Sequence, residues 1–147
     1  MADVSIRAAT LADAARLAVL SEVLGYPATP DALAERLGRL VGRDEELVLV
    51  AEVSPGHIVG WLHGGERELL ESGRRCEILG LVVDLTYRGR GVGRRLVQAA
   101  EAWASTRGLE QMAVRSNVGR AESHPFYERL GYVRAKTQYA YRKRLSA

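Results

Sequence analysis

The chain has 147 residues, of which 47% are hydrophobic and 27% are charged, and its formal net charge is +3. This length predicts one ordinary domain, residues 1–147, with enough apolar residues for a sizeable core. The composition is that of a soluble globular protein and excludes a disordered or fibrous chain. Because acids alternate with the basic residues, the net charge argues against a nucleic-acid partner.

Local sequence patterns exclude two further classes of protein. No apolar run approaches the roughly 20 residues that a membrane-spanning helix needs. The N-terminal letters MADVSIRAAT lack the basic start and apolar stretch of a secretory signal. The single cysteine, Cys76, forbids an internal disulfide and is compatible with a reducing cytoplasm. We therefore expect a cytoplasmic protein without a membrane partner.

The first half of the chain predicts three strands and two helices. In chain order these are strand 4–10, helix 11–24, helix 30–41, strand 46–53 and strand 57–64. Thr10 and Asp13 have the spacing of a capping box at the start of the first helix. Thr29 followed by Pro30 is a favourable start for the second helix. The letters SPG between the last two strands indicate a hairpin.

The second half predicts three more strands and two helices. After a polar connection at 66–75 these are strand 76–85, a helix from 92 that ends at Gly108, strand 109–116, a short helix within 122–132 and an alternating strand 135–145. The order β-α-α-β-β-β-α-β-α-β indicates an α/β (α+β) fold with a βαβ crossover in its second half.

A glycine-rich segment, YRGRGVGRRL at 87–96, joins the apolar strand 76–85 to the next helix. Glycine allows a ligand to approach the backbone closely, and the first amides of a helix are unpaired donors. A phosphate placed there gains these donors and the helix dipole, an interaction worth about 0.3–1 kcal/mol when exposed. Neighbouring arginines add charge-assisted hydrogen bonds. The segment therefore predicts a site for a phosphorylated ligand.

Other interpretations fit this segment less well. A Walker loop needs a lysine and a hydroxyl residue, and neither follows Gly93. A dinucleotide fingerprint would have its third glycine where Arg94 stands. An arginine patch for nucleic acid does not explain the glycine spacing, and no aromatic platform for stacking bases accompanies the arginines. A glycine-rich connection with solvated arginines remains open.

The letters RGRGVG, residues 88–93, match the [QR]-x-x-G-x-[GA] motif of the GCN5-related N-acetyltransferases (GNAT). ILGLVVD resembles the fourth strand of that family, GRRLVQAAEAWASTRGL its cofactor-side helix, FYERLGY its F-Y-x-x-x-G-[FY] element and GWL the G-x-[VIL] of its third strand. The similarity covers essentially the whole chain in the order of the family. It implies the GNAT fold, a mixed central sheet of about six to seven strands flanked by about four helices.

The resemblance implies acetyl-CoA as cosubstrate and assigns its binding residues. The pyrophosphate would lie on the glycine segment, and the pantetheine arm would pair with the backbone of the fourth strand, which diverges from the fifth at a bulge. Asn117 would also contact the arm, although the ten residues between it and Tyr127 exceed the usual gap. The expected cofactor-binding residues are Leu81, Val82, Val83, Arg88, Gly89, Arg90, Gly91, Val92, Gly93, Arg94 and Asn117.

The expected reaction is direct attack of a bound primary amine on the thioester. Deprotonating a lysine-like amine of pKa ~10.4 at pH 7 costs about 4.6 kcal/mol, so a base is useful. The resemblance places Glu77 as general base and Tyr127 as general acid for the leaving thiolate. Glu77 has an equally open alternative as an edge-of-strand acid paired with Arg74, with Arg75 or with a residue on a neighbouring strand. Tyr127 has the alternative of packing beside Phe126.

The remaining polar residues give weaker indications. Cys76 is interpreted as a core residue, His63 as a structural or surface residue, and no metal is expected because no recognisable ligand spacing exists. The amine acceptor is a small molecule or peptide, with the loop at 24–31 and the segment 63–72 expected to shape its site. A non-catalytic acyl-CoA-binding regulatory module is the alternative function. The alternating segment 135–145 leaves a homodimer open.

Overall fold

The computed structural model describes residues 4–115 and 123–146, with the side chain of Ser123 excepted. The chain divides into two compact units, residues 1–115 and 116–147. Each unit is described here by itself, and the expectation of one domain over 1–147 stays a prediction.

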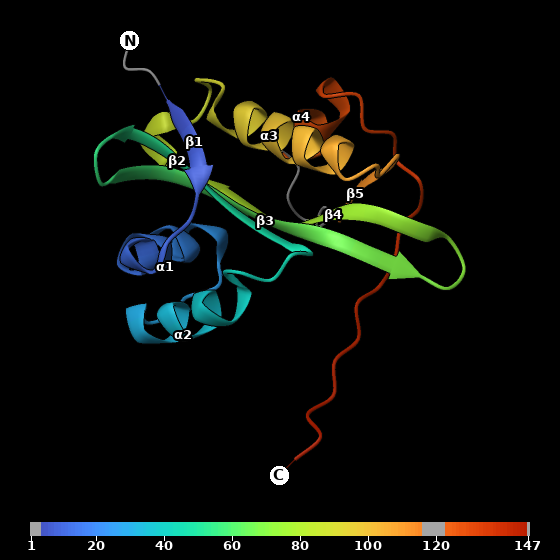
Figure 1. The fold of residues 1–147 in the computed structure, drawn as a ribbon, viewed down its shortest axis with the longest axis horizontal. Coiled ribbons are helices and arrows are strands. Elements are labelled where there is room, and N and C mark those ends of the chain that lie inside the picture. The colour runs from blue at the N-terminus through green and yellow to red at the C-terminus, as the bar shows by residue number, and fades with distance from the viewer. Residues whose placement is uncertain (1–3, 116–122, 147) are drawn as a thin grey trace. The chain divides into compact units, whose positions relative to one another are not determined.

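The first unit is built on a mixed five-stranded sheet in the order β1-β2-β3-β4-β5. Successive strands are antiparallel except for β4 and β5, which are parallel and are joined by a helical crossover (Figure 1). The strands are β1 Ser5–Ala8, β2 Glu46–Ser54, β3 His57–Leu69, β4 Gly73–Val83 and β5 Met112–Val114. Three α-helices flank the sheet: α1 Ala14–Leu24, α2 Pro30–Leu40 and α3 Val92–Thr106.

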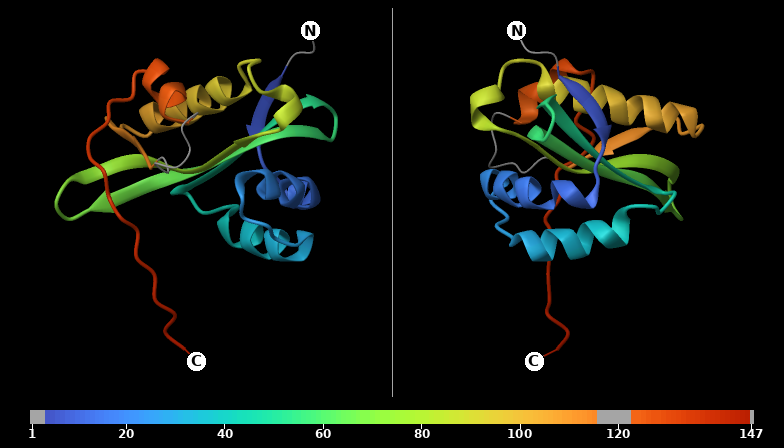
Figure 2. Two further views of the ribbon diagram at one scale, coloured as in Figure 1. Left: turned by 180° about the vertical axis from the view of Figure 1, so that it is seen from behind. Right: turned by 60° about the vertical axis from the view of Figure 1, so that its left-hand side comes forward.

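The helices of this unit cover the two faces of the sheet, with α1 and α2 on one face and α3 on the other (Figure 2). Leu17, Leu20 and Leu37 of the first two helices form a core with Val50 and with other apolar residues of the sheet. The opposite face allows a close approach of α3, because a Cβ atom at Gly60 would lie 3.2 Å from a methyl carbon of Leu96.

The predicted helix starts and ends in this unit are confirmed. Thr10 and Asp13 form the capping box, although the first turn, η1 Leu11–Asp13, is a 3-10 helix that precedes α1. The Thr29 hydroxyl accepts a hydrogen bond from the Ala32 amide at 3.1 Å and caps α2. Gly25 ends α1 with a φ angle of 92°. Local capping chemistry determines these boundaries, so the sequence alone predicts them.

The predicted polar connection at 66–75 is wrong, because β3 and β4 continue through it as a long hairpin. Glu68 lies opposite Arg74 across the two strands, and Glu66 accepts a hydrogen bond from Arg74 at 2.7 Å. Opposite charges on neighbouring strands stabilise pairing as apolar pairs do. A polar composition indicated exposure to solvent correctly, but it did not exclude a strand.

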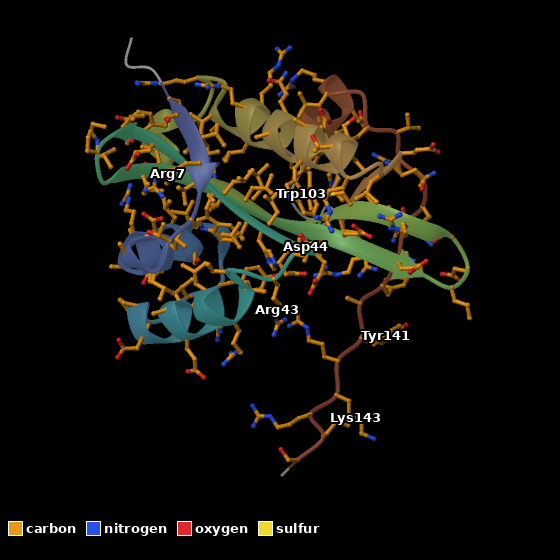
Figure 3. All side chains as sticks on the ribbon, in the orientation of Figure 1. Arg7, Arg43, Asp44, Trp103, Tyr141 and Lys143 are labelled. Carbon is orange, nitrogen blue, oxygen red and sulfur yellow. The ribbon has the colours of Figure 1, made fainter. Side chains whose placement is uncertain are left out.

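The second unit contains α4 Ser123–Arg129 and a C-terminal segment. The predicted short helix within 122–132 is confirmed, and the turn after it closes at Gly131, which has a φ angle of 93° and donates its amide to the Glu128 carbonyl. The predicted terminal strand is wrong: residues 132–146 form neither helix nor strand. Tyr139 and Tyr141 are 87% and 90% exposed, and Figure 3 shows Tyr141 on this irregular stretch.

The missing terminal strand explains why the sheet has five strands in the described residues rather than about six to seven. Alternation of Tyr139 and Tyr141 with the smaller Ala140 gives the side-chain pattern of a strand. A strand also needs a neighbour that accepts its backbone hydrogen bonds, and alternation does not supply one.

Candidate functional site

The glycine segment lies between β4 and α3 and includes η2 Leu85–Tyr87, a single 3-10 turn. Gly89 and Gly91 have φ angles of 76° and 81°, in the left-handed region that favours glycine. No atom lies within 4 Å of the position that a Cβ would take at either residue. The backbone angle therefore requires glycine at these two positions, and the space above them is open.

The first amides of α3 are available to a ligand. The first intrahelical hydrogen bond runs from the Arg95 amide to the Gly91 carbonyl at 3.1 Å. The amides of Gly91, Val92, Gly93 and Arg94 therefore precede the helical ladder, and Gly91 offers no side-chain cap. With the positive end of the helix dipole, they form an arrangement suited to an anion.

Arginines surround these amides. Arg88, Arg90 and Arg94 are exposed, whereas Val92 is buried and offers only its backbone. The guanidinium carbon of Arg90 lies 5.0 Å from the centroid of the Tyr87 ring, within the range of a cation–π contact. The segment thus combines backbone donors with exposed positive charge, which suits a phosphorylated ligand.

A bulge in β4 leaves part of its edge unpaired. His63 lies opposite Gly80 while Gly64 lies opposite Ile78, so Leu79 is the extra residue. Parallel pairing with β5 extends only over Cys76–Ile78. Within the described residues β4 therefore has a free edge from Leu79 to Val83, and the divergence of the two strands that the resemblance implies stays a prediction.

Only part of the expected backbone on this edge faces outward. The Asp84 amide donates to the Val59 carbonyl at 2.8 Å, so Asp84 and, by alternation, Val82 direct their backbone groups to β3. Leu81 and Val83 direct their backbone amides and carbonyls to the free edge of β4. The structure differs here from the expectation for Val82, whose side chain is also buried in the core.

Glu77 lies on the sheet face that carries α1 and α2, opposite Gly65 of β3. Its side chain is 14% exposed, and its Oε1 atom accepts hydrogen bonds from Arg75 Nη2 at 2.6 Å and Nε at 3.0 Å. The ion pair with Arg75, one of the two alternatives for this residue, is therefore present. The role of Glu77 as general base stays a prediction.

A second polar cluster on this face was missed by sequence reasoning. Glu46 is 6% exposed, and its carboxylate is bonded to His63 Nε2 at 2.9 Å and to Arg67 Nη1 at 2.6 Å. Burial favours a higher pKa for Glu46, but the hydrogen bonds from Arg67 and His63 outweigh it and lower the pKa. Gly65 makes room for the pair, because its Cβ would lie 3.1 Å from Glu46 Oε2. Only the register of β2 against β3 could have indicated this cluster.

Cys76 is a core residue, as interpreted from the sequence. It is fully buried with Ala104 and Leu109, on the sheet face opposite to Glu77. Burial raises the pKa of its thiol, which disfavours the thiolate that a nucleophile needs.

Tyr127, in the second unit, lies in an aromatic cluster. Its ring centroid is 5.0 Å from that of Phe126 and 5.8 Å from that of Tyr132. Burial raises the pKa of Tyr127 to about 12, so the phenol keeps its proton at neutral pH. Asn117, the remaining cofactor-binding residue predicted from the sequence, lies outside the described residues.

The described part of the chain shows neither a metal-binding cluster nor a membrane-spanning helix. Among residues 4–115 and 123–146, no group of three or more His, Cys, Asp or Glu side chains is arranged to hold a metal ion. None of the helices there has the length and hydropathy required to cross a bilayer.

Comparison with known protein families and curated proteins gives consistent matches. Residues 14–132 match the acetyltransferase (GNAT) family. The chain is 31% identical over 132 residues to the aminoglycoside N(6')-acetyltransferase type 1 of Stenotrophomonas maltophilia, which covers 87% of this chain and 85% of that protein.

Solved structures share the fold. A transcriptional regulator from Bacillus halodurans C-125 superposes with a TM-score of 0.87 at 25% identity, covering 96% of this chain and 100% of the other. An aminoglycoside N-acetyltransferase in complex with CoA superposes with a TM-score of 0.85 at 21% identity, covering 97% of this chain and 95% of the other.

Proposed function

Because the chain belongs to the acetyltransferase (GNAT) family, as an acetyl-CoA-dependent N-acetyltransferase, we propose that it acetylates a primary amine of a small molecule or peptide. The observation that carries this proposal is the loop between β4 and α3. It combines two glycines at positive φ, helix amides ahead of the hydrogen-bonded ladder and exposed arginines. These features fit the diphosphate of acetyl-CoA.

The free edge of β4 supports the same proposal. Leu81 and Val83 direct backbone donors and acceptors outward, at the correct end of the strand to hold the amide-containing arm that follows the diphosphate. We assign diphosphate binding to residues 88–94 and arm binding to Leu81, Val83 and Asn117. Acetyl-CoA supplies the activated acetyl group, and the protein supplies its orientation.

Glu77 and Tyr127 provide the proton transfers in this proposal. Glu77 accepts the amine proton, directly or through water, as the new nitrogen–carbon bond forms. Arg75 holds the carboxylate in place through two hydrogen bonds. Tyr127 donates a proton to the departing sulfur as the carbon–sulfur bond breaks, and its raised pKa of about 12 keeps that proton available at neutral pH.

The acceptor class is the less defined part of the proposal. The curated relative suggests aminoglycoside amines as the first compounds to test. Glu66, an acid within the segment 63–72 that is expected to shape the acceptor site, is already held by Arg74 and Arg107. We therefore keep small-molecule amines and peptide N-termini as acceptors, in a cytoplasmic enzyme whose homodimer stays a prediction.

Calorimetry with acetyl-CoA and a thiol-release assay test the proposal together. The assay would include simple amines, polyamines, aminoglycosides and peptides with free N-termini. We expect acetyl-CoA to bind and at least one acceptor to release CoA thiol. Binding without turnover by any acceptor would indicate the alternative, a non-catalytic acyl-CoA-binding regulatory module. Absence of binding would refute both.

A double variant separates the enzyme from the binding module more directly. Glu77→Gln combined with Tyr127→Phe should retain the dissociation constant of acetyl-CoA and lose turnover. If turnover with the best acceptor persists in this variant, the assigned catalytic roles are wrong even though the family assignment stands.

A further inference from the structure

Asp84 connects β4 to the glycine segment and uses all of its polar groups to do so. Its amide donates to the Val59 carbonyl at 2.8 Å, and its carbonyl accepts from the Tyr87 amide at 2.9 Å. Its Oδ1 atom accepts from the Thr86 amide and from the Thr86 hydroxyl, both at 3.0 Å. Asp84 therefore fixes the start of η2, the turn that leads into the anion-binding amides.

The second carboxylate oxygen of Asp84 is bound by an arginine from a distant helix. Arg16 of α1 donates from Nη2 to Asp84 Oδ2 at 2.5 Å and from Nε to the Ile58 carbonyl at 2.7 Å. Ile58 lies next to a second irregularity of the sheet, where Ala51 pairs with Gly60 but Glu52 pairs with Ile58. One guanidinium thus joins α1, the start of β3 and the start of the loop.

We propose that Arg16 and Asp84 are positioning residues that hold residues 85–94 in the conformation that binds the diphosphate of acetyl-CoA. This inference rests on the proposed function. Two glycines at positive φ give the loop many alternative conformations when it is released, because glycine loses more backbone freedom on ordering than other residues. A loop that is already ordered binds its ligand more tightly, since the entropy of ordering is not subtracted from the affinity.

The charge of Asp84 is a second reason for its pairing with Arg16. Asp84 is a carboxylate close in sequence to a site for a doubly charged anion, and by itself it would repel that anion. Hydrogen bonds from Thr86 and from Arg16 lower the pKa of Asp84, so it stays ionised at neutral pH. Arg16 compensates this charge and so makes an ionised helix cap compatible with an anion site.

The chain offers a matched control for a merely stabilising role. Arg7 donates to Asp13 from Nη1 and Nη2, both at 2.9 Å, at the start of α1, and its other hydrogen bonds go to Glu52 and Ala8, outside the glycine segment. Asp13 is nearly buried, so Arg7→Gln removes a comparable arginine–carboxylate pair attached to the same helix. It should lower stability without affecting the loop.

Calorimetry with acetyl-CoA distinguishes the two roles. We expect Arg16→Gln to raise the dissociation constant about tenfold, the effect of losing one charge-assisted hydrogen bond. Arg7→Gln should leave the dissociation constant within twofold of the wild-type value. Arg16→Lys, which can reach only one of the two acceptors, should give an intermediate value. Equal dissociation constants for Arg16→Gln and the wild type would overturn the proposal.

Amide hydrogen exchange without cofactor keeps this test separate from that of the proposed function. Amides of residues 85–94 should exchange faster in Arg16→Gln than in Arg7→Gln. Failure of the wild type to bind acetyl-CoA would refute the proposed function, and unchanged exchange would refute the role of Arg16. If Arg16→Gln does not fold, Thr86→Val removes one hydroxyl contact to Asp84 at an exposed site, and an unaltered dissociation constant there would refute the proposal.

Discussion

Two carboxylates, Glu46 and Glu77, lie on the same face of the sheet, and each is held by arginine. Glu46 is nearly buried and is bonded to Arg67 and His63, whereas Glu77 contacts Arg75. A buried carboxylate without such partners would lose its charge. Glu77 lies on β4 itself, two residues before its free edge begins at Leu79, whereas Glu46 lies on β2, two strands away. This difference in position favours Glu77 as the base and Glu46 as a structural acid.

Replacing Glu77 with glutamine tests its role as base. Gln keeps the shape of the side chain but cannot accept the amine proton, so kcat should fall by roughly 10²–10⁴. The remaining rate should rise with pH, because it depends on the free amine in solution. Steady-state kinetics from pH 6 to 10 measure both effects. Glu68→Gln, at an exposed acid of the same hairpin, should leave kcat unchanged. A full wild-type rate in Glu77→Gln would exclude the role.

The pKa of Tyr127 gives a second prediction for a single residue. Burial raises this pKa to about 12, whereas exposed tyrosines ionise near pH 10. Ultraviolet titration of the phenols should therefore include a late component, and Tyr127→Phe should remove it. If the variant removed an ordinary component near pH 10 instead, the phenol would be exposed in solution.

At the scale of elements, the sequence predicted what local chemistry determines. Thr10, Thr29 and Gly25 determine helix ends through contacts within a few residues. The glycine segment joins β4 to α3, as the sequence predicts. The bulge at Leu79 and the Glu46–His63 pair depend on strand register, which no local pattern encodes. The alternation of Tyr139 and Tyr141 was misleading, since strand formation depends on a partner.

Glycine at position 91 begins α3 with a positive φ, and this requirement can be tested by a matched pair of variants. Gly42 has a φ angle of 92° and, like Gly91, has no atom within 4 Å of its Cβ position. Replacing either glycine with alanine should lower the free energy of unfolding by about 1–2 kcal/mol, the cost of a left-handed alanine.

Only Gly91→Ala should also weaken the binding of acetyl-CoA, because the strained residue is part of the predicted anion site. Urea unfolding and calorimetry on both variants measure the two effects separately. Equal cofactor affinity in the two variants would show that the loop conformation is irrelevant to binding.

At the scale of the whole first unit, arginine–carboxylate pairs join segments that are distant in the sequence. Arg7 connects β1 to Glu52 of β2 and to Asp13 before α1, and Arg107 at the end of α3 connects to Glu66 and Asp44. Figure 3 shows Arg7 on β1 and Asp44 ahead of β2, at separate places around the sheet. Such pairs contribute little one by one at an exposed surface, so the half-buried ones dominate the electrostatic stability.

These pairs predict the direction of the pH dependence of folding. Hydrogen bonds from Arg7 lower the pKa of Asp13, and those from Arg67 and His63 lower the pKa of Glu46 against the effect of burial. A carboxyl whose pKa is lower in the folded state binds fewer protons there than in the unfolded chain. Its contribution to stability is therefore complete above the unfolded pKa of about 4, and it is lost as the pH falls through the folded pKa.

The urea midpoint should consequently be constant from pH 7 to 5 and fall steadily between pH 5 and 3. Arg7→Gln removes the largest cause of the lowered pKa of Asp13, so this variant should start at a lower midpoint and lose less of it in acid. A midpoint that is flat down to pH 3, or an equally steep loss in Arg7→Gln, would mean that other groups control the acid sensitivity.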